Sequence, residues 1–289
     1  MDQEHFIDKL FGPGLVTVGG EVHQRQRKIM NPVFSAVQIR PFAPIFETCA
    51  QTLITKWKSE IEGGATFIDC FRELHGMTLD ALGESMFEYN FDAMGKTRAG
   101  GLRDILRNIF ADSPNPTELK MLRDASYRFL PKAIIDLISL SKTKEDKRFA
   151  AWIAASQKIT GGLITQKVKN GGDLKKEKDI LSVIARSLSS QDPNKSLLPV
   201  EALSQMATIT FAGHETTAST LNWLLYEISR NPTWQERLVQ EIRDVRGETG
   251  SGDGPLTVKD MEGMPVLNAI IKVSNPSTIF TLGGINPNV

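Results

Sequence analysis

The feature that most constrains the fold is one long, mostly apolar segment that runs from Pro199 to Arg230. Its length and composition favour a single helix of about 30 residues, which would extend about 45 Å. Because a helix that is apolar on most sides avoids water, we expect it to pass through the interior of its domain. The pair Asn231-Pro232 ends this helix, since a residue that precedes proline disfavours helical geometry.

The remainder of the chain also shows the periodicity of helices rather than of strands. Apolar residues recur at three- and four-residue spacing, with polar residues between them. A Gly-rich surface turn is expected at residues 247–255, and a short helix begins at residue 267. The predicted fold class is mainly α, with a long buried central helix. Shorter helices are predicted at residues 41–58, 71–86, 102–110, 148–169, 179–188 and 233–246.

Charge and composition exclude several classes of function. The 289 residues include 34 Lys and Arg and 34 Asp and Glu, so the net charge is zero. A nucleic-acid-binding protein usually carries a basic excess, and we therefore expect no nucleic-acid partner. The two cysteines, Cys49 and Cys70, are too few for a disulfide framework or a zinc site. We expect both to be buried structural residues, and no metal-ligand set is predicted.

No targeting or membrane-spanning segment is apparent in the sequence. The first five residues are acidic and polar, whereas a secretory signal would begin basic and continue apolar. No run of about 18 uncharged apolar residues occurs, so we expect no membrane anchor. A cytoplasmic location is therefore expected for the chain as given.

A polar motif interrupts the long helix at its middle, in the order Ala212-Gly213-His214-Glu215-Thr216. At about 100° per residue, Ala212, Gly213 and Thr216 share one stripe of the helix. Glu215 flanks this stripe, and His214 points to the opposite side. Two small residues beside a hydroxyl and a carboxylate would let a flat ligand lie against the helix and leave room for a small molecule.

The same motif also permits a purely structural interpretation. Ala212 and Gly213 could mark a tight crossing of two helices, with Glu215 capping a neighbour. A zinc-protease motif, by contrast, is excluded, because no second histidine follows His214 at the required spacing.

A second candidate site lies near the N-terminus, where Arg27 follows His23 by four residues. This spacing places both side chains on one face of a helix. Their charge-assisted hydrogen bonds would suit a pair of carboxylates. The alternative is a solvated basic face without a ligand.

The two motifs together resemble the cytochrome P450 family of haem-thiolate monooxygenases. The central helix of that family carries Ala/Gly-Gly-x-Asp/Glu-Thr-Thr/Ser, and residues 212–217 match each fixed position. The segment around His23 and Arg27 is similar to the family segment that contacts the haem propionates. The resemblance covers residues 12–272 and implies a partial P450 catalytic domain, its distal half, over residues 1–272. The implied haem-binding residues are His23, Arg27, Ala212, Gly213 and Thr216.

The resemblance also implies a reaction. One atom of dioxygen would be inserted into a small apolar substrate, with Thr216 hydrogen-bonding the bound oxygen species and Glu215 relaying protons. A family member of full length would receive electrons from an NADPH-dependent reductase. It would also lie at the cytoplasmic face of the endoplasmic reticulum membrane. Substrate specificity would reside in the variable segment that resembles residues 102–141.

The C-terminal end of the sequence departs from the family pattern. The family holds its iron by a cysteine thiolate in a loop that resembles Phe-x-x-Gly-x-Arg-x-Cys-x-Gly, and the sequence contains no such loop. The Glu and Arg of the family's Glu-x-x-Arg helix would fall where this chain has Val273 and Pro276. We therefore expect residues 273–289 to be a disordered tail outside the family, and the truncated chain to be inactive as given.

Two alternatives to a monooxygenase remain open at this point. One is a non-catalytic, truncated product that binds no haem. The other is an unrelated helical scaffold in which both motifs are accidental.

Overall fold

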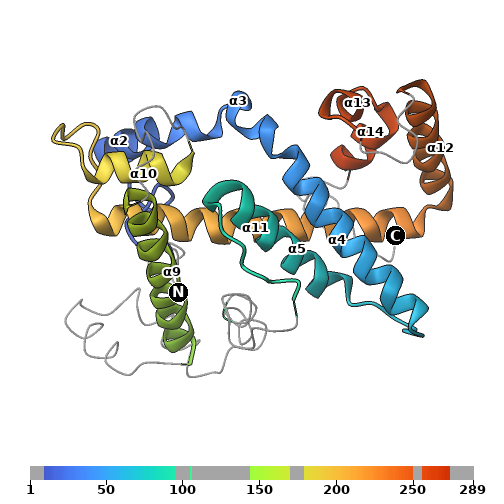
Figure 1. Cartoon of the computed structure of the whole chain (residues 1–289), viewed down its shortest axis with the longest axis horizontal. Coiled ribbons are helices and arrows are strands. Elements are labelled where there is room, and N and C mark those ends of the chain that lie inside the picture. Colours follow the sequence, from blue (N-terminus) through green and yellow to red (C-terminus); the bar gives the residue numbers. More distant parts are fainter. Residues whose placement is uncertain (1–9, 96–104, 106–143, 170–178, 250–255, 274–289) are drawn as a thin grey trace, which may run out of the picture. The chain divides into compact units, whose positions relative to one another are not determined.

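The computed structural model describes residues 10–95, 105, 144–169, 179–249 and 256–273 (Figure 1). The elements in these ranges are all helices, and the ranges contain no strand. The predicted mainly α fold is therefore confirmed. The chain divides into two compact units, one made of residues 1–39 and 82–213 and the other of residues 40–81 and 214–289.

Two helices continue from one unit into the other. They are α5 (Cys70–Phe87) and α11 (Pro199–Arg230). The bounds predicted for the long helix are confirmed by α11, and the next helix, α12 (Pro232–Thr249), begins directly after Asn231. Burial along α11 is strongest over residues 201–210.

The first unit contains α2 (Gly20–Met30), α9 (Lys144–Lys169) and α10 (Ile180–Leu188), and α10 packs against both of the others. The short helices η1 (Asn31–Phe34) and α3 (Ala36–Ile39) follow α2.

The core of the first unit includes Trp152 of α9, which is fully buried. The indole N–H of Trp152 donates a hydrogen bond of 3.1 Å to the main-chain carbonyl of Leu10. The ring of Phe211 meets Trp152 edge-on at 6.3 Å and Phe11 at 5.4 Å. These contacts attach the N-terminal segment and α9 to the middle of α11.

The second unit contains η2 (Arg40–Phe42) and α4 (Ala43–Glu62), followed after α12 by α13 (Val258–Glu262) and α14 (Pro265–Val273). Both α12 and α13 pack against α14. The carboxylate of Glu241 on α12 accepts the main-chain N–H groups of Val266 at 2.8 Å and Leu267 at 2.9 Å. Because the first N–H groups of a helix have no partner inside it, this carboxylate caps α14.

Some predictions of local structure need correction. The turn expected at residues 247–255 is wrong at its start, because α12 continues through Gly247 to Thr249. A single glycine near a helix end costs only about 1 kcal/mol, which the rest of the helix offsets. The helix α13 was not predicted, although Thr257 and Asp260 form the capping box that typically begins a helix.

The two cysteines have different environments. Cys49 is buried in α4, as expected, whereas Cys70 is only half-buried at the first residue of α5. Neither cysteine forms a disulfide.

Several predictions fall on other parts of the chain. The helix expected at residues 102–110 and the variable segment 102–141 lie, apart from residue 105, outside the described residues. The start predicted for the disordered tail is wrong by one residue, because Val273 is the last residue of α14; from residue 274 onward the tail lies outside the described residues.

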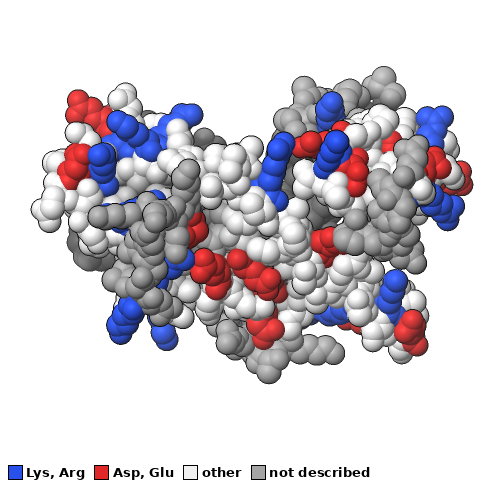
Figure 2. All heavy atoms as spheres, turned by 45° about the horizontal axis from the view of Figure 1, so that its top comes forward, with Lys and Arg blue, Asp and Glu red and all other residues white. Residues whose placement is uncertain are grey.

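The surface is mixed in charge. On the face shown in Figure 2, the described residues present both acidic and basic side chains. Within the described ranges, none of the helices combines the length and the hydropathy that crossing a bilayer requires.

Candidate functional site

The first two residues of the predicted motif on α11 belong to the first unit, where α5 crosses α11. A Cβ atom placed on Gly213 would lie 2.8 Å from Cδ1 of Leu82 on α5. Glycine therefore permits a closer approach of the two helices than any other residue would. The tight helix crossing that the sequence allows at this position is present.

The same small residues also border an apolar cavity inside the first unit. Its volume is about 320 Å³, and its walls include Ala212, Gly213, Leu15, Met30 and Phe34. Pockets that hold small molecules and cofactors have volumes of about 300 to 1,000 Å³. The tight crossing and the cavity wall do not exclude each other, because Gly213 takes part in both.

Helix α2 carries the two residues predicted to bind carboxylates. His23 is half-buried and Arg27 is exposed. Neither side chain has a hydrogen-bond or ion-pair partner among the described residues. The structure does not place them in the wall of the apolar cavity, which α2 reaches instead through Met30.

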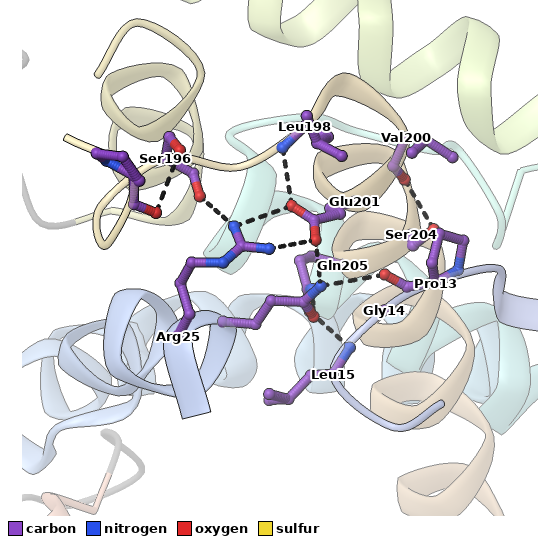
Figure 3. A network of polar contacts seen from close by, with 12 residues as sticks. Pro13, Gly14, Leu15, Arg25, Ser196, Leu198, Val200, Glu201, Ser204 and Gln205 are labelled. Carbon is purple, nitrogen blue, oxygen red and sulfur yellow. Dashed lines mark hydrogen bonds and ion pairs between the residues drawn. The ribbon is translucent and has the colours of Figure 1, made fainter. Parts of the chain in front are cut away.

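A polar network that the sequence analysis missed joins α2 to the beginning of α11 (Figure 3). Arg25 holds Glu201 with two N–H donors, Nη2 at 2.6 Å from Oε1 and Nη1 at 3.1 Å from Oε2. Gln26 donates to the same Oε1 at 3.1 Å and accepts a hydrogen bond of 2.7 Å from Gln205. The main-chain N–H of Leu198 completes the set, 2.8 Å from Oε2 of Glu201.

This network keeps Glu201 ionised. Burial by itself raises the pKa of the Glu201 carboxyl, but hydrogen bonds from Arg25, the Leu198 N–H and Gln26 lower that pKa by more. The only signal in the sequence was the presence of polar residues, such as Gln205, among the apolar positions of α11. Nothing local to Arg25 indicates a partner so distant in the chain.

In the second unit, the carboxylate of Glu215 faces two imidazole rings. Its Oε2 atom lies 3.4 Å from Nε2 of His75 on α5 and 3.7 Å from Nε2 of His214. The side chain of Glu215 is 36% exposed, whereas that of His214 is 3% exposed. Glu215 was predicted as a site residue. His75 was not predicted, because the sequence of α5 around His75 contains no motif that indicates a site.

Each partner of this pair shifts the pKa of the other. The His75 imidazole, 3.4 Å away, lowers the pKa of Glu215, and burial opposes this only in part. Burial lowers the pKa of His75, but the nearby Glu215 carboxylate, the Phe71 carbonyl and the charge of Asp69 raise that pKa by more. The arrangement therefore favours an ionised carboxylate beside a protonated imidazole.

Hydroxyl groups bind the main chain on both sides of Glu215. Thr78 on α5 donates to the carbonyl of His214 at 3.1 Å, and Thr220 donates to the carbonyl of Thr216 at 2.9 Å. The side chain of Thr216 itself is exposed. In the described part of the chain, no cluster of three or more His, Cys, Asp or Glu side chains could hold a metal ion.

Comparison with known proteins identifies the class to which these features belong. The cytochrome P450 family model matches residues 3–272. The chain therefore belongs to the cytochrome P450 family. It is similar in fold to the crystal structure of the cytochrome P450DA heme domain, with a TM-score of 0.70 and 20% identity, over 94% of this chain and 54% of that one.

Among sequence relatives, cytochrome P450 monooxygenase 128 of Postia placenta is 29% identical over 284 residues, covering 93% of this chain and 50% of that protein. Cytochrome P450 4F4 of Rattus norvegicus is 26% identical over 279 residues, covering 93% of this chain and 50% of that protein. The chain thus spans about half the length of the curated relatives that it matches.

Proposed function

We propose that this chain forms the oxygen-activating part of a cytochrome P450 monooxygenase, which inserts one atom of dioxygen into a small apolar substrate. The observation that carries the proposal is the arrangement of α11. This helix borders an apolar cavity with Ala212 and Gly213 and then presents Glu215 and Thr216. The match of the family model to residues 3–272 supports assigning residues 1–272 to part of the catalytic domain.

The residues of the first unit fit a haem group. The walls of the cavity are mainly apolar and include Ala212 and Gly213, and an apolar wall suits the face of a porphyrin. His23 and Arg27 offer donors that have no partner among the described residues, which suits the two propionates. Haem, when bound, would supply the redox-active iron at which dioxygen is reduced.

Glu215 and Thr216 would supply protons to this chemistry. The carboxylate of Glu215 is ionised at neutral pH and half-exposed, so its Oε2 atom can take up a proton from water and release it inward. The hydroxyl of Thr216, next along the helix, would donate a hydrogen bond and hold a water molecule in place for the transfer. The small side chain of Ala212, one turn earlier, would leave room for this water.

The replacement Thr216→Ala tests this proposal. In a full-length P450 that carries residues 199–230 of this chain, we expect product formed per electron pair consumed to fall by about 10²-fold, the typical contribution of a general acid–base group. Thr220→Ala is the matched control, since it removes a hydroxyl one turn further along the same helix. Unchanged coupling in Thr216→Ala would exclude the role assigned to Thr216.

We further propose that residues 1–289 alone do not form a thiolate-ligated haem enzyme. Cys49 is buried within α4 and Cys70 begins α5, and neither lies in a sequence that resembles the ligand loop of the family. A reduced, carbon-monoxide-bound absorption spectrum after haem addition tests this. A stoichiometric red-shifted Soret band would contradict it, and a chain that takes up no haem would support the alternative of a non-catalytic product.

The partners and location follow from the family and are part of the proposal. A full-length protein would receive electrons from an NADPH-dependent reductase at the cytoplasmic face of the endoplasmic reticulum membrane. The apolar lining of the cavity supports an apolar ligand.

A further inference from the structure

The imidazole of His75 has two ring nitrogens, and both face groups that accept hydrogen bonds. Nδ1 lies 2.7 Å from the main-chain carbonyl oxygen of Phe71, which can only accept. Nε2 is shielded from solvent, makes no hydrogen bond, and lies 3.4 Å from Oε2 of Glu215. If the ring were neutral, Nδ1 would carry the proton and the lone pair of Nε2 would face a carboxylate.

The buried Nε2 atom needs a hydrogen-bond partner, and a proton between Nε2 and Oε2 of Glu215 would supply one. Two arrangements satisfy it: an imidazolium beside an ionised Glu215, or a neutral ring that accepts a hydrogen bond from a protonated Glu215. In both, His75 and Glu215 together hold one proton in addition to the one on Nδ1. The ring of Phe71, with its centroid 4.1 Å from that of His75, favours the charged imidazolium because aromatic faces attract cations.

We infer that His75 is a positioning residue for Glu215, which orients the carboxylate and stores the proton that Glu215 passes on. The proton leaves Nε2 for Oε2, and water returns a proton to the pair through the exposed side of Glu215. The inference rests on the proposed role of Glu215. It adds His75, a residue on a different helix, α5. The imidazole of His75 sets the pH range over which the pair holds its proton.

The groups that face His75 come from two elements. From α11 these are Glu215 and the ring of His214, whose centroid lies 6.2 Å from that of His75. Asp69, just before α5, adds a negative charge. Together the two carboxylates hold the pKa of His75 above its ordinary value of 6.5, so the pair keeps its proton to a higher pH than a free imidazole does.

Titration of the His75 imidazole by NMR tests the pairing in the chain itself, without haem. In Glu215→Gln, we expect the proton affinity of His75 to fall by about tenfold, because the amide removes the facing charge. His214→Gln is the matched control, since it removes the other imidazole beside Glu215. It should change the proton affinity of His75 by less than Glu215→Gln does. A proton affinity of His75 within about twofold of wild type in Glu215→Gln would overturn the inference.

The pH dependence of coupling tests what the stored proton does. In the full-length enzyme, product formed per electron pair should decline as pH rises through the pKa of His75. His75→Gln should remove this decline and leave low coupling at every pH, and His75→Lys should restore coupling without the decline, since the ammonium keeps its charge. A His75→Gln profile identical to that of wild type would overturn the inference, even if Thr216→Ala confirms the proposed function. If Thr216→Ala leaves coupling unchanged while the titration of His75 responds to Glu215→Gln as expected, the proposed function is refuted and the pairing of His75 with Glu215 stands.

Discussion

Two of the three glutamates on helix α11, Glu201 and Glu215, lie in contrasting environments. Glu201, in the first unit, has a side chain only 5% exposed and is paired with Arg25. Glu215, in the second unit, is 36% exposed and faces His75. Both carboxyls have a pKa below the ordinary value. A guanidinium does not lose its proton in proteins, whereas an imidazole does so near neutral pH.

The difference lies in whether the partner of the carboxylate can lose its proton. Donors from Arg25, Gln26 and the Leu198 N–H surround Glu201, so its charge cannot change without loss of the network. His75, the partner of Glu215, can release a proton, and the exposed side of the Glu215 carboxylate reaches water. A permanent partner stabilises the fold, and a titratable partner permits proton transfer.

The largest expected effect is on the structural pair. Glu201→Ala should lower the free energy of unfolding by about 3 kcal/mol, because it leaves the guanidinium of Arg25 without its counter-charge. Urea denaturation measures this, with the exposed Glu236→Ala as a control that should stay within about 0.5 kcal/mol of wild type. A loss for Glu201→Ala no larger than for the control would mean that the network contributes nothing.

A smaller loss of stability is expected when Glu215 is replaced. Glu215→Ala should change the free energy of unfolding by about 1 kcal/mol or less, since a half-exposed ion pair is screened by water. The same denaturation experiment gives the value. A loss as large as that of Glu201→Ala would make Glu215 a structural residue and remove the contrast between the two.

The smallest expected effect is a dependence of stability on pH. The pKa of His75 is raised, so its contribution to stability is complete below 6.5 and is lost as pH rises through the higher folded value. The pKa of Glu215 is lowered, so its contribution is complete above 4.5 and is lost as pH falls through the lower folded value. The gap in melting temperature between wild type and His75→Gln should therefore be widest between pH 4.5 and 6.5.

The control for this window is Glu201→Gln, whose gap from wild type should not close on the alkaline side because Arg25 keeps its charge. A His75→Gln gap that stays constant from acid to alkaline pH would show that the imidazole does not titrate within the pair.

The sequence was sufficient to predict the local features of α11. Its length, its end at Asn231 and its motif of small and polar residues all follow from periodicity and turn chemistry within one segment. The tight crossing at Gly213 was also foreseeable, because glycine in a helix interior is costly unless a neighbour needs the space.

The partners of the two glutamates could not be predicted in the same way. Arg25 and Glu201 are 176 positions apart, and only the packing of α2 against the start of α11 brings them together. The local pattern instead drew attention to Arg27, on another side of the same helix. His75 was missed for the same reason, since its role depends on which part of α5 passes α11.

The most direct test is a pH titration of the side-chain carboxyl carbons of Glu201 and Glu215 in one ¹³C-labelled sample of the chain. We predict that the signal of Glu215 shows, besides its acidic inflection, a second one above pH 6.5, where His75 loses its proton. The signal of Glu201 should show only the acidic inflection, because its guanidinium partner does not titrate. If Glu215 shows no inflection above pH 6.5, or if Glu201 shows one of equal size, the two carboxylates do not differ in the way described.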